Sequence, residues 1–288
     1  MSIQNPYLHS KHPQNILHRK LKTWATVASM SVASILIFLK FVSYMRTDSV
    51  SILSSLMDST FDWVASLATM IGVAHAATPA DEEHRFGHGK IEALTALGQA
   101  IFIFGSTVYL MFESMHRFMH PVKIKDIDIG LYMMLISIAL TACLIAFQYF
   151  GIKRTSSIAI AADHLHYKGD LLMNTGVITA LILSYYSPWP YFDPLFAVAI
   201  SVALLFGAVS ITRESIDVLM DREIPEADRQ RIIDIVNDHP DVKVVHDLRT
   251  RSTGTHVFIE LHIEMDGDLS LKRAHSVTED IEKRLYES

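Results

Sequence analysis

Long apolar segments follow one another along most of the chain, and each is long enough to cross a bilayer as a helix. Short polar or proline-containing connections separate them, which is typical of an antiparallel helical bundle. The pattern therefore predicts an all-α membrane domain of six transmembrane helices over residues 24–220, after a cytoplasmic tail at 1–23. The six segments are 24–45, 49–77, 91–118, 127–150, 157–186 and 192–218.

The pattern changes after Asp221. Apolar residues recur at helical spacing in 225–239, two strand-like runs follow at 242–249 and 255–265, and a second helical pattern covers 269–287. This order predicts a small cytoplasmic α+β domain over 221–288 that lacks a closing strand. We expect an open sheet edge in such a domain.

Composition and charge agree with this division. Half of the residues are apolar and 19% are charged, which excludes an ordinary soluble protein. Lys and Arg gather in the N-terminal tail, in loops 78–90 and 151–156, and after the sixth segment, so both termini are predicted to be cytoplasmic. Because Cys143 is the only cysteine, any metal site must use His, Asp or Glu.

The second segment carries a polar stripe. Two aspartates, Asp58 and Asp62, lie one helical turn apart near its middle, where each charge costs roughly 2.5–3.5 kcal/mol to insert. At about 100° per residue, the stripe's members fall within roughly 80° of one another. They are Ser51, Ser55, Asp58, Asp62, Ser66 and Thr69.

The fifth segment mirrors that stripe, because Asp163, His166, Asp170 and Asn174 share a face. Pairing the two stripes brings together four oxygen and nitrogen ligands, a set that suits a tetrahedral divalent cation, above all Zn²⁺. Protons can replace the metal, so the pattern indicates metal and proton exchange. The predicted ligands are Asp58, Asp62, His166 and Asp170.

Other interpretations stay open for these residues. The acids could simply pair within the bundle, although intramembrane ionisable groups are functional by default. An intramembrane metalloprotease is disfavoured, because the chain has no His-Glu-x-x-His motif. A membrane-anchored metal sensor without transport is the main alternative, and Lys40 is interpreted as a snorkelling side chain.

Two further groups have ligand-like spacing. Asp81, His84 and His88 lie in the loop after the second segment, beside glycines that allow a tight turn, although a solvated loop explains them equally well. In the tail, three histidines fall on separate predicted elements and either converge on a metal or are surface residues. They are His246, His262 and His275.

With these motifs assembled, the chain resembles the cation diffusion facilitator family. The matching motifs are Asp58-x-x-x-Asp62, Pro79-Ala80-Asp81 to Phe86-Gly87-His88-Gly89-Lys90, Ala162-Asp163-His164-Leu165-His166-Tyr167-Lys168-Gly169-Asp170, Leu219-Met220-Asp221-Arg222 and His246-Asp247-Leu248-Arg249-Thr250-Arg251. The resemblance implies a homodimeric exporter in the bacterial inner membrane, not an enzyme and not a partner of nucleic acid. It would exchange Zn²⁺, and also Cd²⁺ and Fe²⁺, for protons by alternating access.

The resemblance also implies roles for individual residues. Asp58, Asp62, His166 and Asp170 would form the transport site, and Asp81, His84 and His88 a second metal site. The tail would be a ferredoxin-like dimerisation domain with a regulatory binuclear site at His246, His262 and His275. Lys90 and Asp221 would form a salt bridge at the dimer's membrane surface, with Leu165 as a gate. One departure is that the family's last strand, with a His-x-Asp pair, has no counterpart before Ser288.

The ligand set also bears on which metal is transported. A histidine beside carboxylates favours Zn²⁺ or Cd²⁺ over the harder Mn²⁺. Fe²⁺, Co²⁺ and Ni²⁺ share these ligands, so the sequence leaves the choice among them open.

Overall fold

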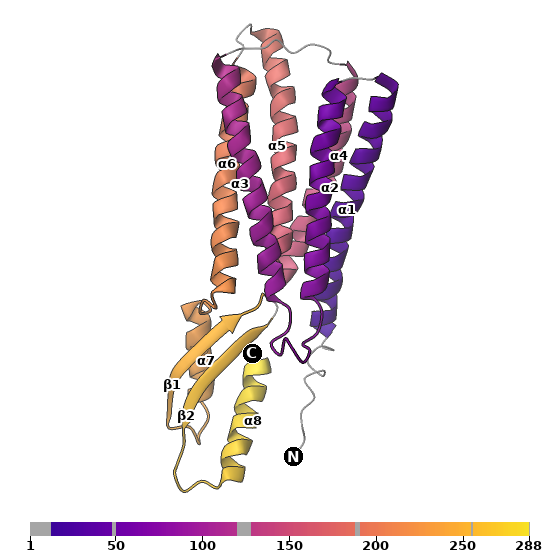
Figure 1. The fold of residues 1–288 in the computed structure, drawn as a ribbon. Helices are drawn as coiled ribbons and strands as arrows, with labels where there is room; N and C mark the ends of the chain where they lie inside the picture. Colours follow the sequence, from indigo (N-terminus) through magenta and orange to yellow (C-terminus); the bar gives the residue numbers. More distant parts are fainter. Residues whose placement is uncertain (1–12, 48–49, 120–127, 188–190, 255, 288) are drawn as a thin grey trace. The chain divides into compact units, whose positions relative to one another are not determined.

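The fold is described from a computed structural model, which covers residues 13–47, 50–119, 128–187, 191–254 and 256–287. The chain divides into two compact units, Met1–Ile216 and Asp217–Ser288 (Figure 1). The first holds the long helices, and the second holds the short helices and the strands. The predicted domain boundary at Asp221 lies close to this division and stays a prediction.

The described part of the first unit consists of long helices, as predicted (Figure 1). The largest difference from the predicted segments is at the start, where the first helix begins about three turns before the apolar run. Pro13 suits that position, because the first helical residue needs no N–H donor. The helices are α1 (Pro13–Thr47), α2 (Val50–Ala76), α3 (Lys90–Met119), α4 (Asp128–Thr155), α5 (Ile158–Tyr186) and α6 (Phe192–Leu219).

Four of the described helices are apolar enough over a long window to be membrane spans by length and composition. The other two long helices, α2 and α5, are the ones that carry the polar stripes. Their polar residues lie where the helices contact each other and their neighbours. The apolar spans are Leu17–Arg46, Lys90–His116, Met134–Thr155 and Pro194–Leu219.

Small residues line the helix contacts. α1 packs against α2 and α4, and α5 packs against α3 and α4. Ala25, Ala96 and Ala159 are fully buried at these contacts, as expected for helices that approach closely in lipid. Large apolar side chains such as Phe38 and Phe112 are instead exposed on the outside of the bundle, where lipid would cover them.

A buried ion pair joins α1 to α3. Lys22 Nζ lies 2.7 Å from Glu92 Oε2, and both side chains are almost entirely buried. Glu92 is in the first turn of α3, where the helix dipole also favours a negative charge. This pair gives the polar beginning of α1 a partner inside the bundle.

The second unit has the predicted order of helix, strand, strand and helix. Its described residues form α7 (Glu226–Asn237), β1 (Val244–Ser252), β2 (Val257–Glu264) and α8 (Leu271–Glu287). The strands are antiparallel, with His246 opposite His262. One face of the sheet packs on the helices, and the buried centre of that core is Ile232, Val236, Val277 and Ile281.

Gly72 on α2 lies directly against Thr95 of α3, and this gives a stability prediction. A Cβ added there would come within 2.0 Å of Thr95 Oγ1, whose hydroxyl already donates to the Ile91 carbonyl at 2.7 Å. Gly72→Ala is expected to destabilise the protein by about 1–3 kcal/mol. Thermal unfolding of the purified protein measures this.

Gly98→Ala is the matched control, because a Cβ at Gly98 would have no neighbour within 4 Å. That change should be neutral or slightly stabilising, since Ala favours a helix over Gly by about 1 kcal/mol. Adding Thr95→Ala to Gly72→Ala should restore part of the loss. Equal stability of the two single alanine variants would contradict the packing argument.

Candidate metal centre

The candidate centre lies where α2 meets α5. His166 Nε2 is 3.0 Å from Asp62 Oδ1 and 3.8 Å from Asp170 Oδ2. One ligand atom from each of these three residues lies within 4.8 Å of the others. The two α5 residues share a face because they are one turn apart, and Asp62 reaches them from the neighbouring helix. The polar stripes of the second and fifth segments therefore meet.

Asp58, the fourth predicted ligand, lies one turn before Asp62 on α2. Its side chain is exposed and is not part of the group of three. The structure thus brings together three of the four predicted transport ligands. Three oxygen and nitrogen donors leave room for a fourth around a tetrahedral divalent cation, so the role of Asp58 stays a prediction.

Two aromatic rings pack near the His166 imidazole. The ring centroid of Phe102 on α3 is 5.8 Å from that of His166, at an edge-to-face angle of 66°. The Tyr167 ring is 5.6 Å away, and its buried hydroxyl lies 2.7 Å from Ser66 Oγ on α2. The imidazole is therefore oriented by packing as well as by the carboxylates.

Asp163, which shares the predicted stripe, has a different environment. Its side chain is fully buried, and its Oδ2 accepts hydrogen bonds from Ser29 Oγ on α1 at 2.6 Å and from Gln148 Nε2 on α4 at 2.8 Å. Gln99 Nε2 on α3 lies 3.4 Å from the other oxygen and also donates to Thr69 Oγ1 on α2 at 2.6 Å. Asp163 therefore links five helices through hydrogen bonds.

Lys40 is a residue whose role the sequence reasoning missed. Instead of snorkelling, its Nζ donates to Ser59 Oγ at 2.6 Å and to the Ser55 carbonyl at 3.2 Å on α2. The carboxylates of Asp62, Asp170 and Asp58 are close enough to attract its positive charge. The sequence feature that indicates this pairing is a lysine in the apolar segment directly before the segment with two aspartates.

The loop between α2 and α3 contains a second cluster. Asp81 Oδ1 lies 3.3 Å from His84 Nδ1, and Asp81 Oδ2 lies 3.4 Å from His88 Nε2. One ligand atom from each residue is within 4.8 Å of the others. Gly87 has a φ of 78°, which lets the loop turn back between the two histidines. The structure thus brings the three predicted loop ligands together.

Hydrogen bonds stabilise the charged form of the Asp81 side chain. Its Oδ1 accepts the backbone N–H of His84 at 2.6 Å and that of Glu83 at 3.1 Å. The hydrogen bond from the His84 backbone lowers the pKa of the Asp81 carboxyl below its usual value, and the neighbouring histidines add to this effect. The charged form, which a metal requires, therefore persists to lower pH than in an isolated aspartate.

The tail histidines are only partly gathered. The rings of His246 and His262 are 5.3 Å apart on the exposed face of the sheet, and His246 Nε2 is 3.4 Å from Glu264 Oε1. His275 on α8 is exposed and lies 3.5 Å from Glu279 Oε1. In the part of the chain that the structure describes, these residues do not form a three-ligand group. The tail site stays a prediction.

Two other predicted roles also remain untested. Leu165 packs against α6, since a Cβ on Gly207 would come within 2.7 Å of its methyl carbons. The role of Leu165 as a gate stays a prediction. Lys90 and Asp221 belong to different compact units, so their predicted salt bridge stays a prediction.

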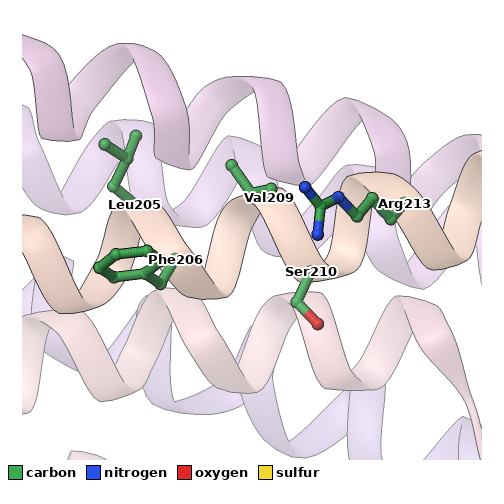
Figure 2. Close-up of a pocket in the computed structure, with 5 residues that line it drawn as sticks. All are labelled: Leu205, Phe206, Val209, Ser210 and Arg213. Carbon is green, nitrogen blue, oxygen red and sulfur yellow. The ribbon is translucent and has the colours of Figure 1, made fainter.

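A surface hollow on α6 is separate from these clusters. Figure 2 shows its lining residues, which all come from one helix: Leu205, Phe206, Val209, Ser210 and Arg213. None of the predicted ligands lines it. A cation site is therefore not assigned to this hollow.

Comparison with known proteins identifies both parts of the chain. Residues 26–220 match the cation efflux transmembrane domain, and residues 224–288 match the cytoplasmic domain of cation efflux proteins, a dimerisation domain. The cation-efflux pump FieF of Salmonella schwarzengrund (strain CVM19633) is 40% identical over 271 residues, which cover 94% of this chain and 90% of the relative. FieF of Salmonella choleraesuis (strain SC-B67) is 40% identical over 273 residues, with coverage of 95% and 91%.

These matches cover nearly the whole chain and both of its units. The membrane helices are those of a multi-pass inner-membrane transporter, and the transported substrates are divalent cations. The chain therefore belongs to the cation diffusion facilitator family and is a cation-efflux transporter of the FieF type rather than an enzyme.

Proposed function

We propose that this transporter exports Zn²⁺, and also Cd²⁺ and Fe²⁺, in exchange for protons through the cluster of Asp62, His166 and Asp170, with Asp58 as the fourth ligand. The observation that carries the proposal is the position of His166 Nε2 between carboxylates of α2 and α5. One imidazole and three carboxylates form a set of borderline and hard donors that suits Zn²⁺.

Competition for the same lone pairs supports the coupling to protons. A bound metal needs a neutral imidazole and charged carboxylates. A proton neutralises a carboxylate and gives the imidazole a positive charge, so metal and protons compete for the same atoms. Because the cluster lies within a membrane helix pair, leaving several bare charges there is costly. The site is therefore expected to hold either a cation or protons, which is the requirement for antiport.

The hydrogen bonds around the cluster support a metal site that is closed on one side of the membrane. On the side toward the C-terminal end of α2, the Ser66 hydroxyl is engaged with Tyr167 and the Thr69 hydroxyl with Gln99. Toward the N-terminal end, Asp58 is exposed. With both termini cytoplasmic, as proposed, this arrangement corresponds to a site closed to the cytoplasm and open to the outside. Alternating access would require the α2–α5 contacts to rearrange.

The loop cluster is proposed as a second metal site. Asp81, His84 and His88 supply a charged carboxylate and two imidazoles outside the membrane helices. The protein would act as a homodimer through its cytoplasmic domain, with His246, His262 and His275 as the proposed ligands there. A membrane-anchored sensor would share these sites but would move no metal across the membrane.

Removing a membrane ligand tests transport directly. Asp62→Asn is expected to lower Zn²⁺-dependent proton flux in proteoliposomes by more than about tenfold, since even the partners of metal ligands are worth 10–100-fold. A pH dye inside the vesicles measures the flux. Asp268→Asn, in an exposed loop of the second unit, is the control and should retain the parental rate. Normal flux in Asp62→Asn would refute the proposal.

Replacing the imidazole tests the choice of metal. His166→Asp should raise the affinity for Mn²⁺ relative to Zn²⁺, because the site then contains only oxygen donors. Competition binding with both ions on the purified protein gives the ratio. An unchanged ratio would show that ligand softness does not set selectivity here.

Lys40 should weaken metal binding electrostatically. Lys40→Met removes a positive charge that interacts with the three acids, so Zn²⁺ affinity should rise by about fivefold, corresponding to roughly 1 kcal/mol. Isothermal titration at constant pH measures the affinity, and Lys40→Arg, which keeps the charge, is the matched control. If Met and Arg behave alike, the charge of Lys40 has no role in binding.

A further inference from the structure

His75, in the last turn of α2, lies beside the loop cluster but was not among its predicted ligands. The centroid of its ring is 5.2 Å from that of His88, and the two rings meet edge to face at 76°. The His88 ring is in turn 4.6 Å from that of His84. Three imidazoles and the Asp81 carboxylate are therefore contiguous at the end of α2.

One of the two imidazole nitrogens of His88 forms no hydrogen bond with the described residues. Its side chain is 9% exposed, and its Nε2 faces Asp81. Within the described residues, its buried Nδ1 has no hydrogen-bond partner. A buried polar atom without a hydrogen-bond partner costs about 1–3 kcal/mol, a cost that an ion bound at this nitrogen would offset.

Hydrogen bonds hold the backbone of His75, whereas its ring is held only by the edge-to-face contact with His88. Its carbonyl accepts hydrogen bonds from the Thr78 backbone N–H at 3.0 Å and from Thr78 Oγ1 at 2.7 Å, which holds the helix end beside the loop. The side chain is exposed, and no hydrogen bond or ion pair with any described residue restrains its ring. A rotation about its side-chain bonds can therefore aim a nitrogen at the cluster without breaking a contact of that kind.

We propose that His75 is a fourth ligand of the loop site, which then holds Zn²⁺ through three imidazoles and one carboxylate. This inference rests on the loop metal site proposed above. Four protein ligands make a closed site of the structural kind, with no position open for an exchanging ligand. The bound metal would tie the end of α2 to the loop that leads into α3.

That connection matters because α2 also carries Asp62. His75 follows Asp62 by about 20 Å along the helix axis at 1.5 Å per residue. A metal bound by the loop and His75 would restrain one end of the helix that bears a transport ligand. The loop site would then hold α2 in place rather than serve as a relay for transported ions.

Co²⁺ binding tests the ligand directly, because four-coordinate tetrahedral Co²⁺ absorbs visible light much more strongly than five- or six-coordinate Co²⁺. The test uses a full-length background variant with Asp62→Asn, His166→Gln and His262→Gln, which removes the other proposed sites. This background should bind Co²⁺ with intense tetrahedral bands. Adding His75→Gln should reduce those bands and weaken Co²⁺ binding by about 10–100-fold.

Matched variants in the same background separate the outcomes. His18→Gln removes another exposed histidine and should change neither spectrum nor affinity. His84→Gln should abolish tight binding. If His84→Gln weakens binding and His75→Gln leaves both affinity and spectrum unchanged, the role of His75 is overturned and the loop site stands.

A different result would refute the loop site itself. If the background binds no Co²⁺, the loop does not hold a metal and the proposal for His75 falls with it. Thermal unfolding in the absence of metal provides the folding check. Because the His75 side chain is exposed, His75→Gln should unfold at the same temperature as the background, so lost binding would reflect the missing ligand.

Discussion

The high cost of charge inside a membrane is the constraint on which the rest of this structure depends. A buried ionisable side chain is costly without a partner, and neighbouring helices supply partners to several of those in this bundle. Lys22 pairs with Glu92, and Asp163 receives hydrogen bonds from neighbouring helices. At the candidate centre, His166 lies between two carboxylates. Packing of small residues brings the helices close enough for these contacts to form.

The bundle contains two kinds of polar cluster, and they differ in the groups that surround their carboxylates. Asp163 is surrounded by neutral groups that belong to the protein, and it forms hydrogen bonds with Ser29, Gln148 and Gln99. The Asp62 cluster combines like charges with one imidazole and stays partly exposed. The first arrangement fastens helices together, whereas the second has the chemistry of an exchangeable site. A single stripe on α5 thus serves two purposes.

Two of the polar side chains along α2 form specific hydrogen bonds with neighbouring helices, a more specific role than lining a continuous path for ions. Ser66 and Thr69 are buried and hydrogen-bonded to Tyr167 and Gln99. They join α2 to α5 and α3 on one side of the cluster, so under the proposed function these contacts would have to break for a cation to pass there.

The sequence by itself determined the long helices, the order of elements in the tail, and the spacing that puts His166 and Asp170 on one face of α5, because apolar periodicity and helical geometry are local properties. Only the tertiary structure decided which stripe residues meet. Asp163 shares that face but contacts α1 and α4, and Lys40 turns toward α2 rather than toward the membrane surface. The physical reason is that partners for buried polar groups come from other helices, and helical spacing within one segment carries no information about its neighbours.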